Sequence, residues 1–264
     1  MEWYLAYLLL GAFVGFFAGL FGIGGGLVMV PVLSYLFEAQ HLGETQNLHL
    51  ALGTSMAAIL YTAASSARTH YAHGAVNMHI VRSITPGLLS GTLLGALLAS
   101  SVSQFYLATF FALFVYFAAA QMLLELQPKA ARQLPGNIGL TLVGSIIGAI
   151  SSLVSIGGGA LSVPFMLWHN IPFRQAIGTS AALGFPIALG GTIGYVATGL
   201  TLHTLPAGTL GFVYLPALLM LVAGSTFTTS LGAKATHSLP LKPLRRSFAV
   251  LLFILATKML LQAF

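Results

Sequence analysis

The sequence predicts an all-α polytopic membrane protein built from two inverted repeats. Of its 264 residues, 57% are hydrophobic and only 5% are charged. A soluble globular domain carries about 25% charged residues, so this chain lacks the polar side chains that a water-exposed surface of its size requires. Its apolar runs are long and unbroken, whereas the strands of a membrane β-barrel form short alternating segments. A triple-glycine motif that occurs twice indicates the duplication.

Ten apolar segments are expected to form helices. A helix needs about 20 residues to cross a bilayer, and eight segments reach or approach that length. Two shorter segments, 27–37 and 160–169, each follow a glycine run and are predicted to be re-entrant arms. The eight long segments are 4–21, 48–70, 80–100, 104–124, 136–155, 176–198, 210–231 and 244–261.

A polar stretch near the middle of the chain separates two halves of the same order. Each half consists of a long segment, a glycine run, a short segment and three further long segments. The sequence therefore predicts a first transmembrane repeat at 1–125, a cytoplasmic linker at 126–135 and a second transmembrane repeat at 136–264. Each repeat is a broken-helix hairpin followed by three long transmembrane helices.

The two glycine runs, 24–26 and 157–159, are followed at the same spacing by Pro31 and Pro164. Each glycine costs a helix about 1 kcal/mol relative to alanine. Each proline removes a backbone donor and disfavours helical geometry in the preceding residue, so both runs are predicted to break a helix. In hydrocarbon, irregular backbone is tolerated only where protein or a wet cavity surrounds it. We therefore expect both breaks to face the protein interior.

A second matched motif supports the duplication. The pattern Ala-x-Gly-Thr-Ser occurs at 51–55 and at 176–180, and at the same offset His70 aligns with Tyr195. Internal repeats of this kind are common in secondary transporters.

Loop charges predict that the two repeats are inverted. Bases concentrate in the loop 232–243, in the linker 126–135 and around the loop that Arg68 and Arg82 flank, which the positive-inside rule assigns to the cytoplasm. The loop 38–46 has two acids and no base, so it is expected outside. Its counterpart in the second half, the loop 168–174, then lies inside. Each glycine break is therefore predicted to be the tip of a hairpin that enters the membrane and leaves it on the same side.

A parallel arrangement is the alternative. In that case a long segment and its short partner form one broken helix that spans the membrane. That model places the four bases in and directly after the loop 232–243, which are Lys234, Lys242, Arg245 and Arg246, outside, against the charge rule.

The hairpin tips are predicted to bind an anion. A helix that begins at a glycine run offers unpaired N–H donors and about half a positive charge, and glycine lets a ligand approach the backbone. Two inverted tips would present two such ends to one point. The chain's acids, Glu2, Glu38, Glu44 and Glu125, lie at predicted helix ends or in loops, which argues against a cation site at membrane depth. The predicted substrate-binding residues are Gly24, Gly25, Gly26, Thr54, Ser55, Gly157, Gly158, Gly159, Thr179 and Ser180.

Structural alternatives exist for these residues. Small residues in membrane helices commonly serve close helix packing, and Ser and Thr commonly bond backbone carbonyls of their own helix. His70 is a candidate proton-coupling residue, with an interfacial position at a helix end as the alternative. The chain has no Cys and no Asp, so no thiolate chemistry and no Ser-His-Asp set is expected. We predict no enzyme, no cofactor and no metal site.

The paired motifs resemble those of the TauE/SafE family of membrane permeases, the sulfite exporter family. They are Gly-Ile-Gly-Gly-Gly-x-x-x-x-Pro in the first half, the same motif beginning Ser155-Ile156 in the second, and Ala-x-Gly-Thr-Ser in both. The resemblance implies transport of small sulfur-containing anions such as sulfite, thiosulfate or organosulfonates. Ser155 replaces the glycine that opens the first motif, Gly22, which makes the second turn less flexible.

The functional prediction is therefore a multi-pass permease of the plasma (bacterial inner) membrane that moves a small anion by alternating access. Its expected partners are the anion and the lipid bilayer. Nucleic acid is not expected, and a homo-oligomer is left open. An anion channel is the main alternative, although the helices show no polar stripe long enough to line a pore. A transporter of a non-sulfur organic anion is another.

Overall fold

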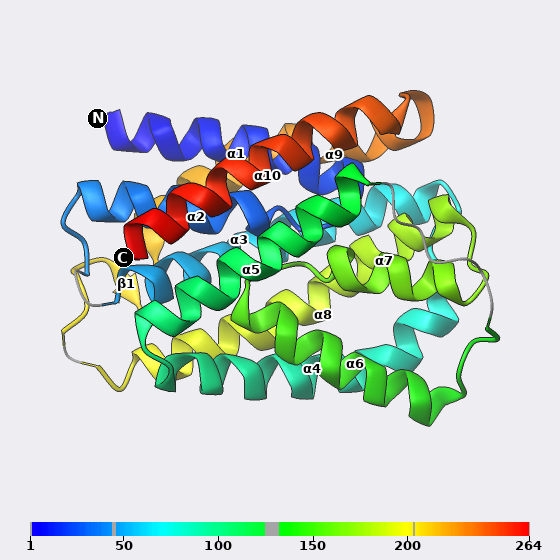
Figure 1. Cartoon of the computed structure of the whole chain (residues 1–264), viewed down its shortest axis with the longest axis horizontal. Helices are drawn as coiled ribbons and strands as arrows, with labels where there is room; N and C mark the ends of the chain where they lie inside the picture. Colours follow the sequence, from blue (N-terminus) through cyan, green and yellow to red (C-terminus); the bar gives the residue numbers. More distant parts are fainter. Residues whose placement is uncertain (1, 44–45, 125–131, 203, 264) are drawn as a thin grey trace.

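The computed structural model describes residues 2–43, 46–124, 132–202 and 204–263, and this part of the chain is almost entirely helical (Figure 1). The all-α prediction is confirmed. The one exception is a two-stranded antiparallel hairpin in which Thr209 pairs with Tyr214 and Leu210 with Val213. The elements are α1 (Glu2–Phe21), α2 (Gly26–Ala39), α3 (Asn47–Ala72), α4 (Met78–Ser101), α5 (Gln104–Leu123), α6 (Asn137–Leu153), α7 (Gly159–Trp168), α8 (Phe173–Gly199), β1 (Thr209–Leu210), β2 (Val213–Tyr214), α9 (Leu215–Ser238) and α10 (Leu241–Ala263).

Each of the ten predicted segments corresponds to a helix, with two corrections. Among the described residues, α1, α3, α4, α5, α8 and α9 are long and apolar enough to cross a membrane. The helix α6 has only 17 residues, because the second glycine run ends it before full membrane depth. The helix expected from position 210 begins at Leu215, because the β-hairpin occupies the preceding residues and Pro216 fits the first helical turn.

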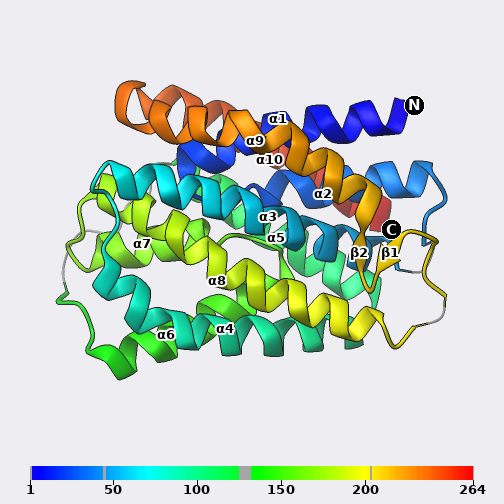
Figure 2. The same cartoon turned by 180° about the vertical axis from the view of Figure 1, so that it is seen from behind.

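The glycine breaks are hairpin tips. In Figure 1, α1 runs inward from the end that carries the N-terminus, and α2 returns from the first break to that same end. The helix α6 enters from the opposite end and α7 returns there. Figure 2 shows the same course from behind. The repeats are therefore inverted, and neither short segment continues its long partner across the membrane.

The two repeats interlock. Each consists of five helices in the same order, so α1 corresponds to α6, α2 to α7, α3 to α8, α4 to α9 and α5 to α10. The helix α1 of the first repeat packs along α9 of the second, and α6 of the second packs along α4 of the first. The matched helices α3 and α8 pack on each other at the centre, as α5 and α10 do at one side. The repeat limits 1–125 and 136–264 stay a prediction, since residues 125–131 of the junction lie outside the described part.

Glycines allow these exchanged pairs to pack closely. A Cβ on Gly15 of α1 would lie 2.8 Å from Ser225 Cβ of α9, and one on Gly144 of α6 would lie 2.5 Å from the Ile84 carbonyl of α4. Small residues let membrane helices approach to backbone contact, which increases their dispersion contacts. Much of the small-residue content of this chain therefore serves packing between the repeats.

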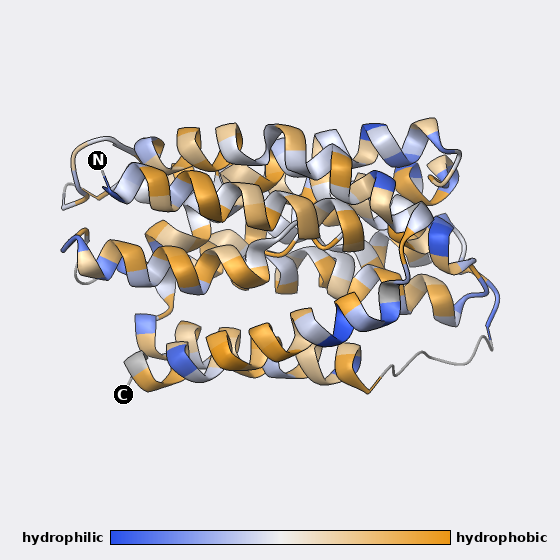
Figure 3. Cartoon of the chain, turned by 90° about the horizontal axis from the view of Figure 1, so that it is seen from above, coloured by the Kyte–Doolittle hydropathy of each residue, from blue (hydrophilic) through white to orange (hydrophobic). Residues whose placement is uncertain are grey.

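Charge separates the two ends of the bundle. Figure 3 shows apolar residues along the helices and hydrophilic residues gathered towards the ends. Glu2 and Glu38 lie at the end that carries the N-terminus. Eight of the described bases lie at the other end, which the positive-inside rule assigns to the cytoplasm. They are Arg68, Arg82, Arg132, Arg174, Lys234, Lys242, Arg245 and Arg246.

The inverted fold predicts opposite exposure for the ends of the two hairpins. The chain has no cysteine, so single-cysteine variants report without background. We expect Ala39→Cys, at the end of α2, to react with a membrane-impermeant maleimide added to whole cells. We expect Asn170→Cys, just beyond α7, to react only after the cells are opened. Both residues are exposed, so labelling of both in whole cells would contradict the inverted topology.

Candidate functional site

The two glycine runs cross each other at the centre of the bundle. The backbone N–H of Gly157 donates to the Ile23 carbonyl at 3.1 Å. A Cβ on Gly24 would lie 2.7 Å from Gly157 Cα, and one on Gly157 would lie 2.8 Å from Gly24 Cα. Gly159 likewise leaves no room for a side chain against Ile23. The backbones of the two hairpin tips are thus in contact. These glycines therefore serve close packing, whether or not they also bind a ligand.

Two left-handed glycines begin the short helices. Gly25 has φ 82° and Gly158 has φ 84°, and they are the N-cap residues of α2 and α7. Neither glycine has a side chain that could cap its helix. The first i to i+4 hydrogen bond of α2 runs from Met29 N to the Gly25 carbonyl, and that of α7 runs from Ser162 N to the Gly158 carbonyl. Both helices therefore present first-turn N–H groups and their positive dipole ends to the crossing point.

The threonines of the Gly-Thr-Ser motifs connect the repeats. Thr54 Oγ1 on α3 accepts a hydrogen bond from the backbone N–H of Tyr214, the N-cap residue of α9, at 2.9 Å. Thr179 Oγ1 on α8 accepts one from Asn77, the N-cap residue of α4, also at 2.9 Å. Each threonine thus fixes the start of a helix of the other repeat. Their role in substrate binding stays a prediction.

The motif serines differ between the halves. Ser180 Oγ donates to the Gly22 carbonyl at 3.1 Å and accepts from Ser162 Oγ at 3.0 Å. Ser55 Oγ is buried and has no hydrogen-bond partner within the described residues. A buried hydroxyl without a partner is costly, so Ser55 retains hydrogen-bonding capacity that a ligand could use.

His70 lies inside the protein. It is fully buried, and its Nε2 lies 3.2 Å from the Gly19 carbonyl of α1. Its counterpart Tyr195 is also fully buried and donates to the Ser152 carbonyl of α6 at 2.9 Å. The two residues hold equivalent positions, each bonding the entering helix of a hairpin near its tip. Burial corrects the expectation of an interfacial position, and the proton-coupling role stays a prediction.

A small internal cavity lies beside the crossing point, between α1, α3 and α8, and it leaves no room for a water molecule. Ser66 lines it, is 2% exposed, and its Oγ has no hydrogen-bond partner among the described residues. Ser66 is not among the site residues predicted from the sequence. The signal was its spacing of four from Thr62 and His70, which puts three polar side chains on one face of a membrane helix. The lining residues are Ala18, Gly22, Gly24, Thr62, Ala63, Ser66, Gly157, Ala181 and Gly184.

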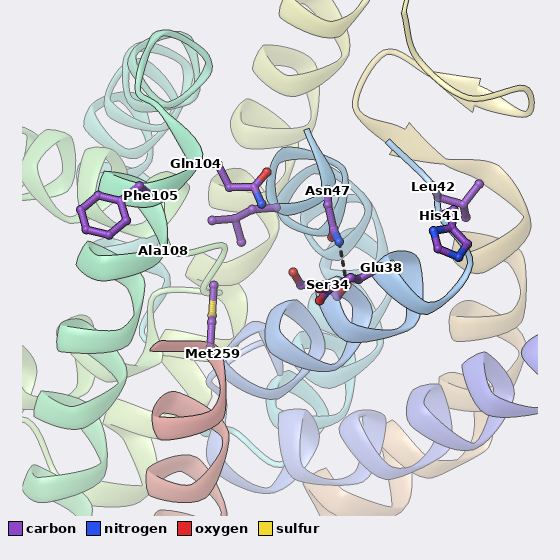
Figure 4. Close-up of a pocket in the computed structure, with 10 residues that line it drawn as sticks. Ser34, Glu38, His41, Leu42, Asn47, Gln104, Phe105, Ala108 and Met259 are labelled. Atoms are coloured by element: carbon purple, nitrogen blue, oxygen red, sulfur yellow. Dashed lines mark hydrogen bonds between the residues drawn. The ribbon is translucent and has the colours of Figure 1, made fainter. Parts of the chain in front are cut away.

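An outer cavity of about 400 Å³ lies between α2, α3, α5 and α10 on the non-cytoplasmic side (Figure 4). Its lining is polar: Glu38 and Ser34 come from α2, Asn47 from α3 and Gln104 from α5. Asn47 Nδ2 donates to the Ser34 carbonyl at 3.0 Å, which ties α3 to α2 at the cavity wall.

An inner cavity of about 60 Å³ occupies the equivalent place in the other half, between α7, α8, α10 and α5. It reaches the hairpin tips at Ile23 and Gly159, and Gln121 and Arg245 line its cytoplasmic part. Replacing each helix that lines the outer cavity by its counterpart in the other repeat gives the helices that line the inner cavity. The crossing point lies between them and is closed.

Known proteins identify the family. The sulfite exporter TauE/SafE family model matches residues 7–259. The chain belongs to this family. It is 38% identical over 260 residues to a probable membrane transporter protein of Haemophilus influenzae, covering 97% of each chain. It is 25% identical over 263 residues to one of Methanocaldococcus jannaschii, covering 96% of this chain and 94% of the relative. No solved structure matches the chain significantly. The chain is therefore an integral multi-pass protein of a membrane transporter family.

The backbone contact at the crossing point predicts that Gly157 tolerates no side chain. Its φ is not left-handed, so alanine adds only a steric clash with Gly24. Overpacking of this kind costs about 1–3 kcal/mol. We expect Gly157→Ala to lower the thermal unfolding midpoint of the detergent-purified protein by several degrees. Gly136→Ala is the control, because a Cβ there has no neighbour within 4 Å. Equal midpoints for the two variants would contradict the crossing.

Proposed function

We propose that this TauE/SafE family transporter carries small sulfur-containing anions, such as sulfite, thiosulfate or organosulfonates, by alternating access. The observation that carries the proposal is the meeting of two uncapped helix N-termini at the centre of the bundle. Both termini direct partial positive charge to one point. Of the described carboxylates, Glu2 and Glu38 both lie at the outer end and leave the centre free of negative charge. The choice of sulfur-containing anions draws on the family description.

Unpaired hydroxyls supply the remaining donors. Ser55 and Ser66 both lie on α3 and are buried without hydrogen-bond partners in the described part of the chain. The two serines lie about 16 Å apart along α3, so one small anion reaches only one of them. Ser66 lines the cavity beside the crossing point, and the oxygens of a sulfonate or sulfite bound there would accept a hydrogen bond from its hydroxyl and from first-turn N–H groups of α2 and α7. The predicted residues Gly24, Gly25, Gly26, Gly157, Gly158 and Gly159 would contribute backbone groups to this site.

Alternating access is supported by two cavities on opposite sides of the closed crossing point, of which the inner one reaches the hairpin tips at Ile23 and Gly159. A channel would have a continuous polar path. Here Gly24 and Gly157 meet backbone to backbone at the crossing point, and the cavity beside them has no room for a water molecule. The helices α5 and α10 pack on each other and line both cavities. A shift of this pair against the hairpins would widen one cavity and narrow the other. We also infer that the chain is not an enzyme, since it has no Asp and no Cys.

Transport by purified protein in liposomes tests the substrate and the site. We expect uptake of labelled sulfite, thiosulfate or an organosulfonate, and no uptake of a monovalent cation. Loss of one donor bond costs about 1–3 kcal/mol, so Ser66→Ala should raise the apparent KM by about tenfold. Ser90→Ala, which removes an exposed hydroxyl on α4, is the control. Uptake of a carboxylate but of no sulfur anion would support the organic-anion alternative, and an unchanged KM in Ser66→Ala would remove this serine from the site.

Cysteine accessibility separates a carrier from a channel. Ala108 lines the outer cavity and Ala160 the inner one. In liposomes of one orientation, we expect Ala108→Cys to react only from outside and Ala160→Cys only from inside. A transported anion that drives the exchange between states should change the two reaction rates in opposite directions. Reaction of either cysteine from both sides would favour a channel.

A further inference from the structure

A groove on the outer surface of the bundle carries two cations that no part of the proposed transport path uses. It lies between α3 and α9 towards the cytoplasmic end and has a volume of about 560 Å³. Both helices run along the face turned to the viewer in Figure 2, where the surrounding lipid would lie. Arg68 projects from α3 and Lys234 from α9, and both side chains are exposed.

Among the described residues, no carboxylate serves as a counter-ion for these two cations. Within the described residues, neither Arg68 nor Lys234 lies within ion-pair distance of a carboxylate, and the described acids Glu2 and Glu38 are at the opposite end of the bundle. Each cation sits about one helical turn inside the end of its helix, at the depth of the bilayer interface. A pair of cations at that depth attracts an anionic group from the membrane surface.

The rest of the groove suits the body of a lipid. Its two walls are joined by a hydrogen bond between Ser65 Oγ and Ser230 Oγ at 3.2 Å, which places hydroxyl groups below the cations. One turn deeper lie Tyr61 of α3 and Thr226 of α9, and the Thr226 hydroxyl is taken up within its own helix by the Val222 carbonyl at 2.8 Å, so this part of the groove is mainly apolar. The order from the cytoplasmic end inward is therefore charge, hydroxyl and hydrocarbon, which is the order of phosphate, ester and acyl chain in a phospholipid.

We propose that this groove binds an anionic phospholipid of the cytoplasmic leaflet. The phosphodiester lies between Arg68 and Lys234, the ester oxygens face Ser65 and Ser230, and an acyl chain follows Ala64 towards the bilayer centre. The groove opens sideways to lipid, so a lipid reaches it directly from the leaflet. A phosphatidylcholine brings its own cation and is disfavoured. The site is separate from the transported substrate and does not depend on its identity.

Native mass spectrometry of the full-length protein with added lipid tests the site. We expect phosphatidylglycerol to be retained in preference to phosphatidylcholine. Each base near a membrane surface contributes about 1 kcal/mol, so Arg68→Gln/Lys234→Gln should weaken phosphatidylglycerol binding by about 30-fold. The control, Arg82→Gln/Arg174→Gln, removes the same charge from exposed positions at the same end and should bind as the native chain does. Ala64→Trp keeps both cations, fills the groove and should also lose the lipid.

Several results would overturn the proposal. Native affinity in Arg68→Gln/Lys234→Gln or in Ala64→Trp would show that the lipid binds elsewhere. Equal loss in the control pair would show a general charge effect, and equal retention of phosphatidylcholine would show no headgroup recognition. Displacement of phosphatidylglycerol by inorganic phosphate at low millimolar concentration would assign the groove to a free anion. Melting in nanodiscs with and without phosphatidylglycerol gives a second measurement, in which only the native chain and the control pair should be stabilised by the anionic lipid.

Discussion

The close crossing of the two glycine runs is the contact on which the remaining structure depends. Gly24 and Gly157 approach until a single added carbon would clash with the backbone of the other run. That approach allows two hairpins from opposite membrane faces to meet inside hydrocarbon, where unpaired backbone would otherwise be intolerable. The bond from Gly157 N to the Ile23 carbonyl satisfies one donor and one acceptor of the two turns. Each tip therefore provides part of the polar surroundings that the other tip needs.

The exchange of helices between the repeats follows from this crossing. Once the tips are fixed against each other, the entering helix of each hairpin packs along a late helix of the other repeat, α1 on α9 and α6 on α4. Thr54 and Thr179 then bond the first residues of those late helices, and His70 and Tyr195 bond the entering helices near the tips. The histidine and tyrosine bonds hold each hairpin within its own repeat, whereas the two threonine bonds join the repeats, so neither repeat is complete without the other.

More of the fold than of the candidate site can be predicted from the sequence. Hydropathy gives the helices, the duplicated glycine-proline spacing gives the repeats, and the bases of the loop 232–243 decide between inverted and parallel halves. These signals are local or summed over whole segments. The sequence predicts that the two tips converge on one point, but not that Gly24 and Gly157 close it by backbone contact, because that contact joins positions that are far apart in the chain. Ser66 was missed for the same reason: its spacing marks a polar helix face but says nothing about what that face meets.

The boundary of the second β-strand shows a different kind of failure. Residues 210–214 are as apolar as the helix that follows, so hydropathy extends the helix through them. Gly208 and Gly211 both have positive φ, at 84° and 54°, and turn the chain into the hairpin before Pro216 starts the helix. Hydropathy measures burial and cannot distinguish a buried turn from a buried helix, whereas left-handed backbone makes the distinction.

The balance of charge at the centre sets what the proposed site can hold. Each helix N-terminus contributes about half an elementary charge, so α2 and α7 together offset about one negative charge. A singly charged organosulfonate would be neutralised there, whereas a doubly charged anion would leave about one charge uncompensated at membrane depth, where an unpaired charge is costly. Arg245 lines the inner cavity and not the crossing point, so its guanidinium can attract an anion from the cytoplasm without adding to the charge at the tips. At the proposed site the backbone would therefore favour a monovalent anion, and the side chains of the cavities would govern access to it.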